Sequence, residues 1–204
     1  MVRKREKSEQ TLAAIVKAGL EIAAQHGLQG ITLSAVAKRL QISKSGVFVR
    51  AGSLEALQNM VLDEYEDVFA RTVFMPALSQ PAGLPRLDEV MRLWIGSAVD
   101  ATSVTGVLHG VGAFEFDHVP GAMRERLVEG TQRWRKTLVR TVEQSKSLGH
   151  LSSDVEPEQM VFELFGLVMG FLYDVRLSND PGSRDRVFAA YDRLVKSYRP
   201  AVVA

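Results

Sequence analysis

Apolar residues recur every three or four positions along most of this chain, and no segment shows the strict alternation of a β-strand. The first run covers residues 8–26, where Leu12 and Ile15 share one helical face and Gly27 is placed to end the helix. Two short segments follow between residues 31 and 57. Longer helices are then predicted over residues 54–76, 86–101, 104–116, 120–147, 157–179 and 183–198. The pattern therefore predicts an all-α fold of about nine helices.

The two short segments have the spacing of a helix-turn-helix. Val36, Ala37 and Leu40 give the first segment one apolar face. Thr32 or Ser34 is placed to cap its N-terminus. Ala37 is small, which allows two short helices to cross closely, as this motif requires.

The second short segment begins after Ser43, a residue that favours the N-cap position. We expect Ile42 to fill the turn and Val47 to face the core. Residues 44–46, a lysine, a serine and a glycine, then remain exposed at the N-terminal end of the helix. Short or cationic groups at that position suit a helix that enters the major groove of DNA.

The segment from about Thr11 to Leu57 resembles the DNA-binding domain of the tetracycline-repressor-like (TetR/AcrR) regulators. The resemblance lies in the joint spacing and covers about a quarter of the chain. The matching positions are Ala18, Ala23, Gly27, Thr32, Val36, Ala37, Ile42, Ser43, Lys44, Phe48, Ser53, Glu55, Ala56 and Leu57. It implies a ligand-responsive transcriptional regulator, expected to be a repressor that binds an inverted-repeat operator as a dimer and is released by a small hydrophobic effector.

The match departs from the usual pattern of that family in four places, one of them a pair of residues. Gln41 stands where Gly is usual, and a left-handed backbone there would cost roughly 1 kcal/mol. Phe48 replaces a phosphate-binding Tyr, and Leu54 replaces a Lys. Arg50 and Ala51 replace a His-Phe pair. The missing phosphate donors keep open an alternative function, an all-α small-molecule-binding protein with degraded operator recognition.

Charge is unevenly distributed along the chain. Residues 1–60 hold nine Lys and Arg against four Asp and Glu, a balance of +5, which leaves 16 bases against 20 acids, or −4, in the rest. A basic front suits double-stranded DNA, although a basic N-terminus can also be a solvated tail. The predicted DNA-binding residues are Arg3, Lys4, Arg5 and Lys7 in a flexible arm, with Thr32, Leu33, Ser34, Ser43, Lys44, Ser45, Gly46, Phe48 and Arg50.

The helix predicted over residues 157–179 is apolar nearly all round, since Glu163 and Asp174 are its only charged residues between positions 160 and 175. Such a helix needs cover on more than one side. It is either the central core helix of a monomer or a helix shared with a symmetry mate. The family resemblance implies dimerisation through the last two long helices. The predicted homodimer residues are Phe162, Gly166, Gly170, Val187, Tyr191 and Leu194.

Large side chains are concentrated in the second half of the chain, and any one of them can be core filler. Three glycines weaken the helix predicted over residues 104–116, so that it can pack loosely beside a cavity. The effector should be neutral and hydrophobic, or a lipophilic cation paired with Glu115 or Asp117. The predicted ligand-binding residues are Trp94, His109, Phe114, Phe116, Trp134, Phe165, Met169 and Tyr173.

Several functions are excluded by what the chain lacks. It has no Cys, no G-x-S-x-G, no Walker loop and no dinucleotide fingerprint, so we expect no enzyme, no cofactor and no metal. Glu115, Asp117 and His118 do not share a clean metal-binding face. The longest apolar run, residues 164–173, is too short for a membrane span and no signal peptide is seen, so we expect a cytoplasmic protein. The expected domains are residues 1–57 for DNA binding and 58–204 for ligand binding and dimerisation.

Overall fold

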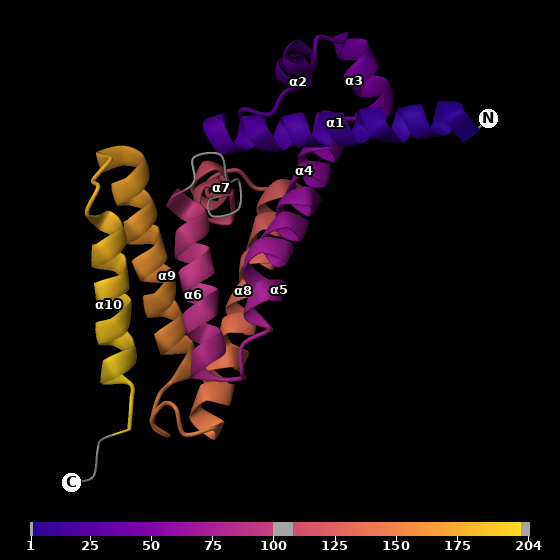
Figure 1. The fold of residues 1–204 in the computed structure, drawn as a ribbon. Helices are drawn as coiled ribbons and strands as arrows, with labels where there is room; N and C mark the ends of the chain where they lie inside the picture. Colours follow the sequence, from indigo (N-terminus) through magenta and orange to yellow (C-terminus); the bar gives the residue numbers. More distant parts are fainter. Residues whose placement is uncertain (1, 100–107, 201–204) are drawn as a thin grey trace. The chain divides into compact units, whose positions relative to one another are not determined.

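The computed structural model describes residues 2–99 and 108–200, and the side chains at 2–7, 98–99 and 108–111 lie outside that description. Every regular element within these ranges is helical (Figure 1). The α-helices are α1 (Val2–His26), α2 (Leu33–Leu40), α3 (Lys44–Ala51), α4 (Leu54–Phe69), α5 (Met75–Ala77), α6 (Leu84–Val99), α7 (Leu108–Phe116), α8 (Ala122–Ser147), α9 (Pro157–Tyr173) and α10 (Ser183–Ser197). Two π-helical turns, η1 (Ala70–Phe74) and η3 (Asp174–Ser178), follow α4 and α9.

The predicted all-α fold is confirmed. Because α4, η1 and α5 follow one another without a loop, as α9 and η3 do, the described elements form the nine helical stretches that the sequence predicts. The first helix differs, since α1 begins at Val2 rather than at Ser8. The backbone of the predicted flexible arm is therefore helical. The predicted start of the sixth helix, residue 104, lies outside the described residues.

Side-chain caps set the starts of three helices in the N-terminal region. The hydroxyl of Thr32 accepts a hydrogen bond from the Ala35 N–H at 3.0 Å, which makes Thr32 rather than Ser34 the cap of α2. Ser43 caps α3 and Ser53 caps α4 in the same way, each at 3.0 Å. Each cap satisfies an N–H group that the helix leaves without a partner, so the sequence itself fixes where these helices begin.

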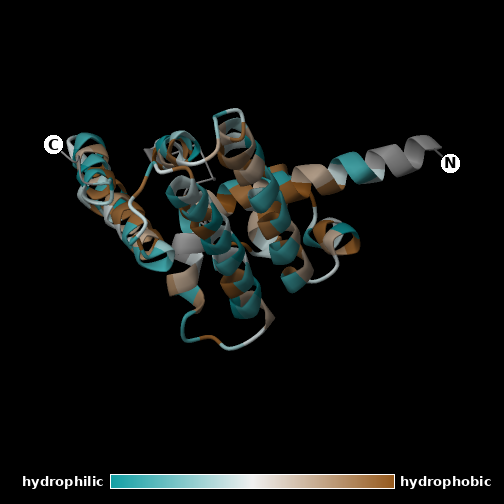
Figure 2. Ribbon diagram, turned by 90° about the horizontal axis from the view of Figure 1, so that it is seen from below, coloured by the Kyte–Doolittle hydropathy of each residue, from teal (hydrophilic) through white to brown (hydrophobic). Residues whose placement is uncertain are grey.

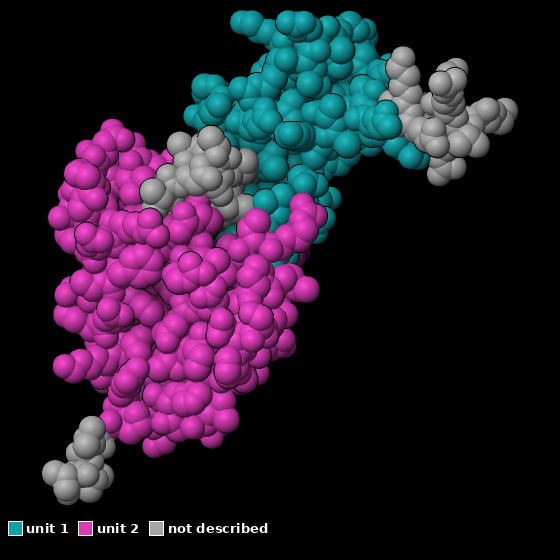
Figure 3. Space-filling view, viewed as in Figure 1, with its two compact units in different colours: residues 1–70, 100–128 teal, residues 71–99, 129–204 magenta. Residues whose placement is uncertain are grey.

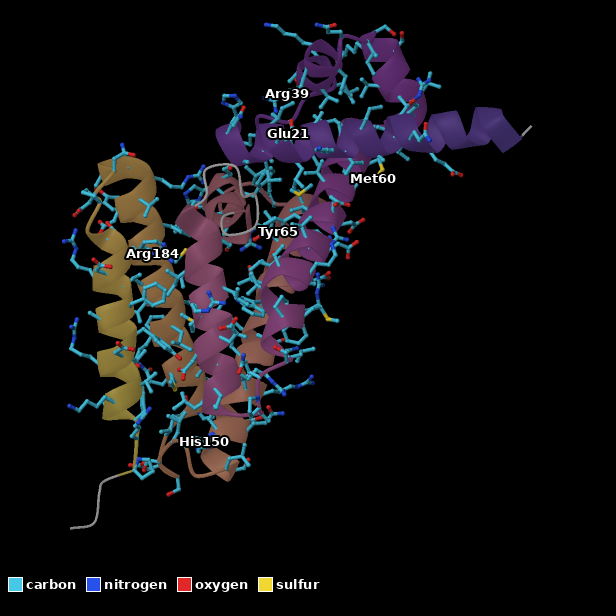
Figure 4. The ribbon with its side chains drawn as sticks, viewed as in Figure 1. Glu21, Arg39, Met60, Tyr65, His150 and Arg184 are labelled. Atoms are coloured by element: carbon cyan, nitrogen blue, oxygen red, sulfur yellow. The ribbon has the colours of Figure 1, made fainter. Side chains whose placement is uncertain are left out.

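The chain divides into two compact units (Figure 3). Unit 1 holds residues 1–70 and 100–128. Its core packs α1 against α2, α3 and α4, and Met123 and Leu127 of α8 complete it. Met60 packs against this core and Tyr65 of α4 is buried in it (Figure 4). Arg126 of α8 pairs with Asp63 and, at 3.3 Å, with Glu66 of α4, so the start of α8 belongs to this unit.

Unit 2 holds residues 71–99 and 129–204. In it α9 packs against α10 and α6, and α9 and α10 run side by side (Figure 1). The helix nearest the C-terminus, α10, carries both hydrophilic and hydrophobic residues, as an amphipathic helix does (Figure 2). In α9 only Glu158 and Glu163 are charged. The imidazole of His150 accepts a 3.1 Å hydrogen bond from the Leu84 N–H at the start of α6 (Figure 4). Among the described residues, no helix has both the length and the apolar character that a membrane crossing needs.

Candidate functional site

The segment α2–turn–α3 has the geometry of a helix-turn-helix. Val36 and Val47, one from each helix, are fully buried, as predicted. Between the helices Gln41 adopts a left-handed backbone (φ 55°, ψ 40°). This confirms that the turn places a non-glycine residue in a strained conformation. The prediction that Ile42 fills the turn is wrong, because Ile42 remains 37% exposed and does not belong to the core of unit 1.

The outward face of α3 carries both polar and apolar side chains. Lys44, Ser45 and Phe48 are exposed, and the Ser45 hydroxyl lies 3.1 Å from that of Ser43. Val49, one helical turn after Ser45, is 79% exposed. Sequence reasoning missed Val49, although its position four residues after Ser45 is the signal that places both on one face.

The other predicted DNA-binding residues have mixed surroundings. The Arg50 guanidinium donates a 2.9 Å hydrogen bond to the Gly46 carbonyl of its own helix. Leu33 packs against the core of unit 1, whereas Ser34 is exposed. The hydroxyls of Thr32 and Ser43 accept hydrogen bonds from the N–H groups of Ala35 and Gly46, yet each residue stays exposed. The side chains of Arg3, Lys4, Arg5 and Lys7 lie outside the described residues.

The guanidinium of Arg39 joins α2 to α1. Arg39 of α2 forms a 3.2 Å ion pair with Glu21 of α1 and a 3.0 Å hydrogen bond with Gln25 (Figure 4). This guanidinium therefore fixes α2 on α1, while Lys38 and Lys44 remain exposed. The exposed ammonium groups of Lys38 and Lys44 can meet phosphate.

Helix α7 is attached to the loop between α1 and α2. The carboxylate of Glu115 accepts hydrogen bonds from the N–H groups of Leu28 at 3.2 Å and Gln29 at 2.8 Å. The Gln29 amide donates in return to the Glu115 carbonyl at 2.8 Å. Gly27, at φ 75°, leaves room for the Glu115 carboxylate, because a Cβ at this position would lie 2.1 Å from it. Glu115, considered above as a partner for a cationic effector, is thus engaged within unit 1.

Three of the predicted ligand-binding aromatics meet inside unit 2. The Trp94 ring lies edge-on to Trp134 at 5.4 Å and to Phe165 at 5.1 Å between centroids. The guanidinium of Arg135 sits 4.4 Å above the Phe165 ring. These residues come from α6, α8 and α9. The sequence pattern did not suggest Arg135, because its contact crosses from one helix to another and has no local signature.

The remaining predicted ligand-binding residues do not belong to this aromatic group. Phe116 packs against the core of unit 1. Phe114 is 73% exposed and Tyr173 is 62% exposed, while Met169 is partly buried. The side chain of His109 lies outside the described residues.

The outer surface of α9 and α10 carries an exposed apolar side chain and two bare glycines on α9 beside charged residues on α10. Phe162 is 62% exposed, and a Cβ added at Gly166 or Gly170 would meet no atom within 4 Å. A shallow groove between the two helices is lined by Glu163, Gly166, Leu167, Ala190, Arg193, Leu194 and Ser197. Of the predicted dimer residues, Phe162, Gly166, Gly170 and Leu194 reach this surface.

The other two predicted dimer residues face inward. Val187 and Tyr191 are buried within unit 2. The Tyr191 hydroxyl donates a 2.7 Å hydrogen bond to the Asp88 carboxylate at the edge of a cleft between α6 and α10. Burial raises the pKa of Asp88, against the opposing effects of the Tyr191 hydrogen bond and the Arg199 charge. Burial also raises the pKa of Tyr191.

Comparison with known proteins gives the following matches. Residues 83–191 match the family model described as "Tetracyclin repressor-like, C-terminal domain". No curated protein sequence matches the chain. A TetR-family transcriptional regulator from Cytophaga hutchinsonii has a similar structure, with 19% identity, 95% of this chain and 96% of that chain covered, and a TM-score of 0.79.

Two further solved structures are similar over nearly the whole chain. A TetR transcriptional regulator from Chloroflexus aurantiacus has 18% identity and a TM-score of 0.80, with 94% of this chain and 95% of that chain covered. AibR, solved in complex with isovaleryl coenzyme A and operator DNA, has 18% identity and a TM-score of 0.69, with 93% and 98% covered. At these identities the likeness establishes the fold.

Proposed function

Because this chain belongs to the tetracycline repressor-like (TetR) family of transcriptional regulators, we propose that it is a ligand-responsive repressor that binds an inverted-repeat operator as a homodimer. The observation that carries DNA binding is the outward face of α3, where Lys44 and Ser45 stand exposed at a capped helix N-terminus. Such an end offers backbone N–H groups to phosphate and side chains to base edges. That the similar AibR was solved with operator DNA and a ligand supports both partners.

We assign DNA binding to residues 1–57, and ligand binding and dimerisation to residues 58–204. Two recognition helices of a dimer must stand about 34–36 Å apart to meet successive major grooves. An effector that favours another spacing releases the operator, by its differential affinity of typically ~1–3 kcal/mol.

The dimer contact that we propose is the outer surface of α9 and α10 around Phe162, Gly166 and Gly170. Phe162 exposes a large apolar area there, and the bare backbones at Gly166 and Gly170 allow a partner helix to approach closely. Loss of water from this surface would favour association. The exposure of these positions on α9 supports the proposed dimer contact, since a helix of this apolar composition needs cover on two sides.

The effector that we propose is mostly apolar, with neutral hydrophobic compounds ranked above lipophilic cations. Trp94, Trp134 and Phe165 supply ring faces in one place. Arg135 already lies over Phe165, so a cation occupies one of these ring faces, and this supports ranking neutral compounds above cations. Trp134→Ala or Phe165→Ala should weaken the effector response and leave operator binding without effector nearly intact. Release of the protein from DNA only by sugars, phosphates or metal ions would contradict this.

DNA binding is tested by a mobility-shift titration of the full chain against DNA from upstream of its own gene, at several salt concentrations. The log–log salt slope should be steep, roughly −0.9 per phosphate contact. Deletion of residues 1–7 should flatten the slope, and Lys44→Ala should weaken operator binding. If no salt-sensitive shift occurs on any inverted repeat, the repressor function is wrong and the alternative, a small-molecule-binding protein with degraded operator recognition, takes its place.

A further inference from the structure

Val49 of α3 is the most exposed large apolar residue in the described part of the chain, at 79%, and the adjacent Phe48 is 55% exposed. Both lie on the helix whose N-terminus carries Lys44 and Ser45. The burial of Val47 on the opposite face holds the helix in one rotation, so Val49 stays turned away from the protein.

The stability of the free protein does not explain why Phe48 and Val49 are apolar at exposed positions. A β-branched residue is a poorer helix former than Ala, Lys or Glu, and at 79% exposure it gains little from burial. A single exposed apolar residue is ordinary on a protein surface. Two of them beside an exposed lysine, on the helix proposed to enter DNA, point to a ligand that offers apolar and acceptor groups together.

The major groove of DNA offers that combination. Guanine presents the O6 and N7 acceptors, and the C5 methyl group of thymine is the apolar group on the base edges. Ser45 and Val49 are four residues apart, which is about 6 Å along a helix, or roughly two base-pair steps. Resting on the DNA-binding function proposed above, we propose that Val49, with Phe48 beside it, recognises a thymine methyl group about two base pairs from the base that Lys44 or Ser45 contacts.

The test removes only that methyl group. An operator is first selected from a random DNA pool with the wild-type full-length protein, and each thymine is then replaced in turn by deoxyuracil. At one position in each half-site the loss should lower affinity about fourfold, the value of burying one methyl group. Val49→Ala should bind more weakly and lose this sensitivity, with an unchanged salt slope.

Lys44→Ala is the matched control on the same helix. It should lower affinity for the thymine and deoxyuracil operators by the same factor and so retain the methyl effect. If no thymine-to-deoxyuracil change alters wild-type affinity, or if Val49→Ala keeps the full effect, the inference is overturned while the proposed function stands. If no operator can be selected at all, the proposed function falls and the inference falls with it. Circular dichroism of Val49→Ala should match the wild type, because the residue is exposed.

Discussion

The carboxylate of Glu115 accepts a 2.8 Å hydrogen bond from the backbone N–H of Gln29, which lies 86 residues earlier in the chain. A second hydrogen bond from Leu28 engages the other carboxylate oxygen. The end of α7 is thereby tied to the loop that leads into the helix-turn-helix. Close packing continues at Gly112, where a Cβ would lie 2.8 Å from the Leu28 side chain.

Loss of this carboxylate should destabilise the protein. Glu115→Ala leaves the N–H groups of Leu28 and Gln29 without their acceptor, and because the site is only partly buried we expect a loss of about 1–2 kcal/mol in the free energy of unfolding. Glu115→Gln keeps one oxygen acceptor and should lose about half as much. Urea denaturation of the three proteins measures this. Equal stability of Glu115→Ala and the wild type would show that water replaces the contact at no cost.

The left-handed turn residue gives a stabilising prediction. Gln41→Gly should raise the free energy of unfolding by about 1 kcal/mol, because Gly adopts φ 55° without a Cβ penalty. Asn179 has almost the same conformation, at φ 50°, and is the matched control. Asn tolerates this region better than Gln, so Asn179→Gly should gain less. The denaturation midpoints of both variants and of the wild type measure these two gains in stability. A larger gain at Asn179 than at Gln41 would refute the explanation by backbone strain.

The elements that the sequence predicted well are those whose signals are local. Ser43 and Ser53 each accept a capping hydrogen bond from the N–H group three residues later, so a short window of sequence contains the whole signal. The start of α1 was predicted six residues late, because residues 2–7 are mostly charged and carry no apolar period. The family assignment succeeded for a similar reason, since its motif lies within one short segment.

The parts of the candidate sites that sequence reasoning missed depend on distant contacts. The contact between Arg135 and Phe165 joins α8 to α9, and no spacing rule links the two residues. Phe116 was grouped with the ligand-binding aromatics, but it packs with the core of unit 1, because an apolar residue type does not reveal which core it joins. Val187 and Tyr191 were placed at the dimer surface for the same reason.

The Asp88–Tyr191 pair gives a prediction about pH. Part of Asp88 reaches solvent, yet burial of its carboxyl raises the pKa above the usual 3.8. A raised carboxyl pKa means that the folded state holds the proton more tightly than the unfolded state. Its stabilising contribution is complete below pH 3.8 and is lost as pH rises through the folded-state pKa. Asp88→Asn cannot ionise and can still accept from Tyr191, so its stability relative to the wild type should increase over that range.

Melting temperatures of both proteins at closely spaced pH values measure the difference. Tyr191→Phe is the informative companion, because it removes the hydrogen bond that lowers the pKa of Asp88. In that variant the pKa should rise further, and the loss of stability should extend to higher pH. A difference between wild type and Asp88→Asn that does not change with pH would mean that the carboxyl titrates alike in both states.

The last prediction concerns assembly and uses the two glycines of α9. Gly166→Arg should give monomers at micromolar concentration, because a long charged side chain would stand where a partner helix is proposed to approach. The monomer itself should tolerate the change, since a Cβ at Gly166 meets no atom within 4 Å. Helical circular dichroism should therefore be retained, and replacing a helical Gly should even favour the helix by up to about 1 kcal/mol.

Gly96→Arg on α6 is the matched control for this change. It also replaces a helical glycine whose Cβ position is open, on a helix other than the two of the proposed dimer contact. This variant should keep the oligomeric state of the wild type in sedimentation velocity. If Gly166→Arg remains dimeric, or if the wild type sediments as a monomer, the exposed surface of α9 does not carry the dimer. In that case Phe162 and Gly170 have to be assigned to another contact. Loss of dimerisation in Gly166→Arg alone would instead place the two-fold contact at the surface of α9 around Gly166.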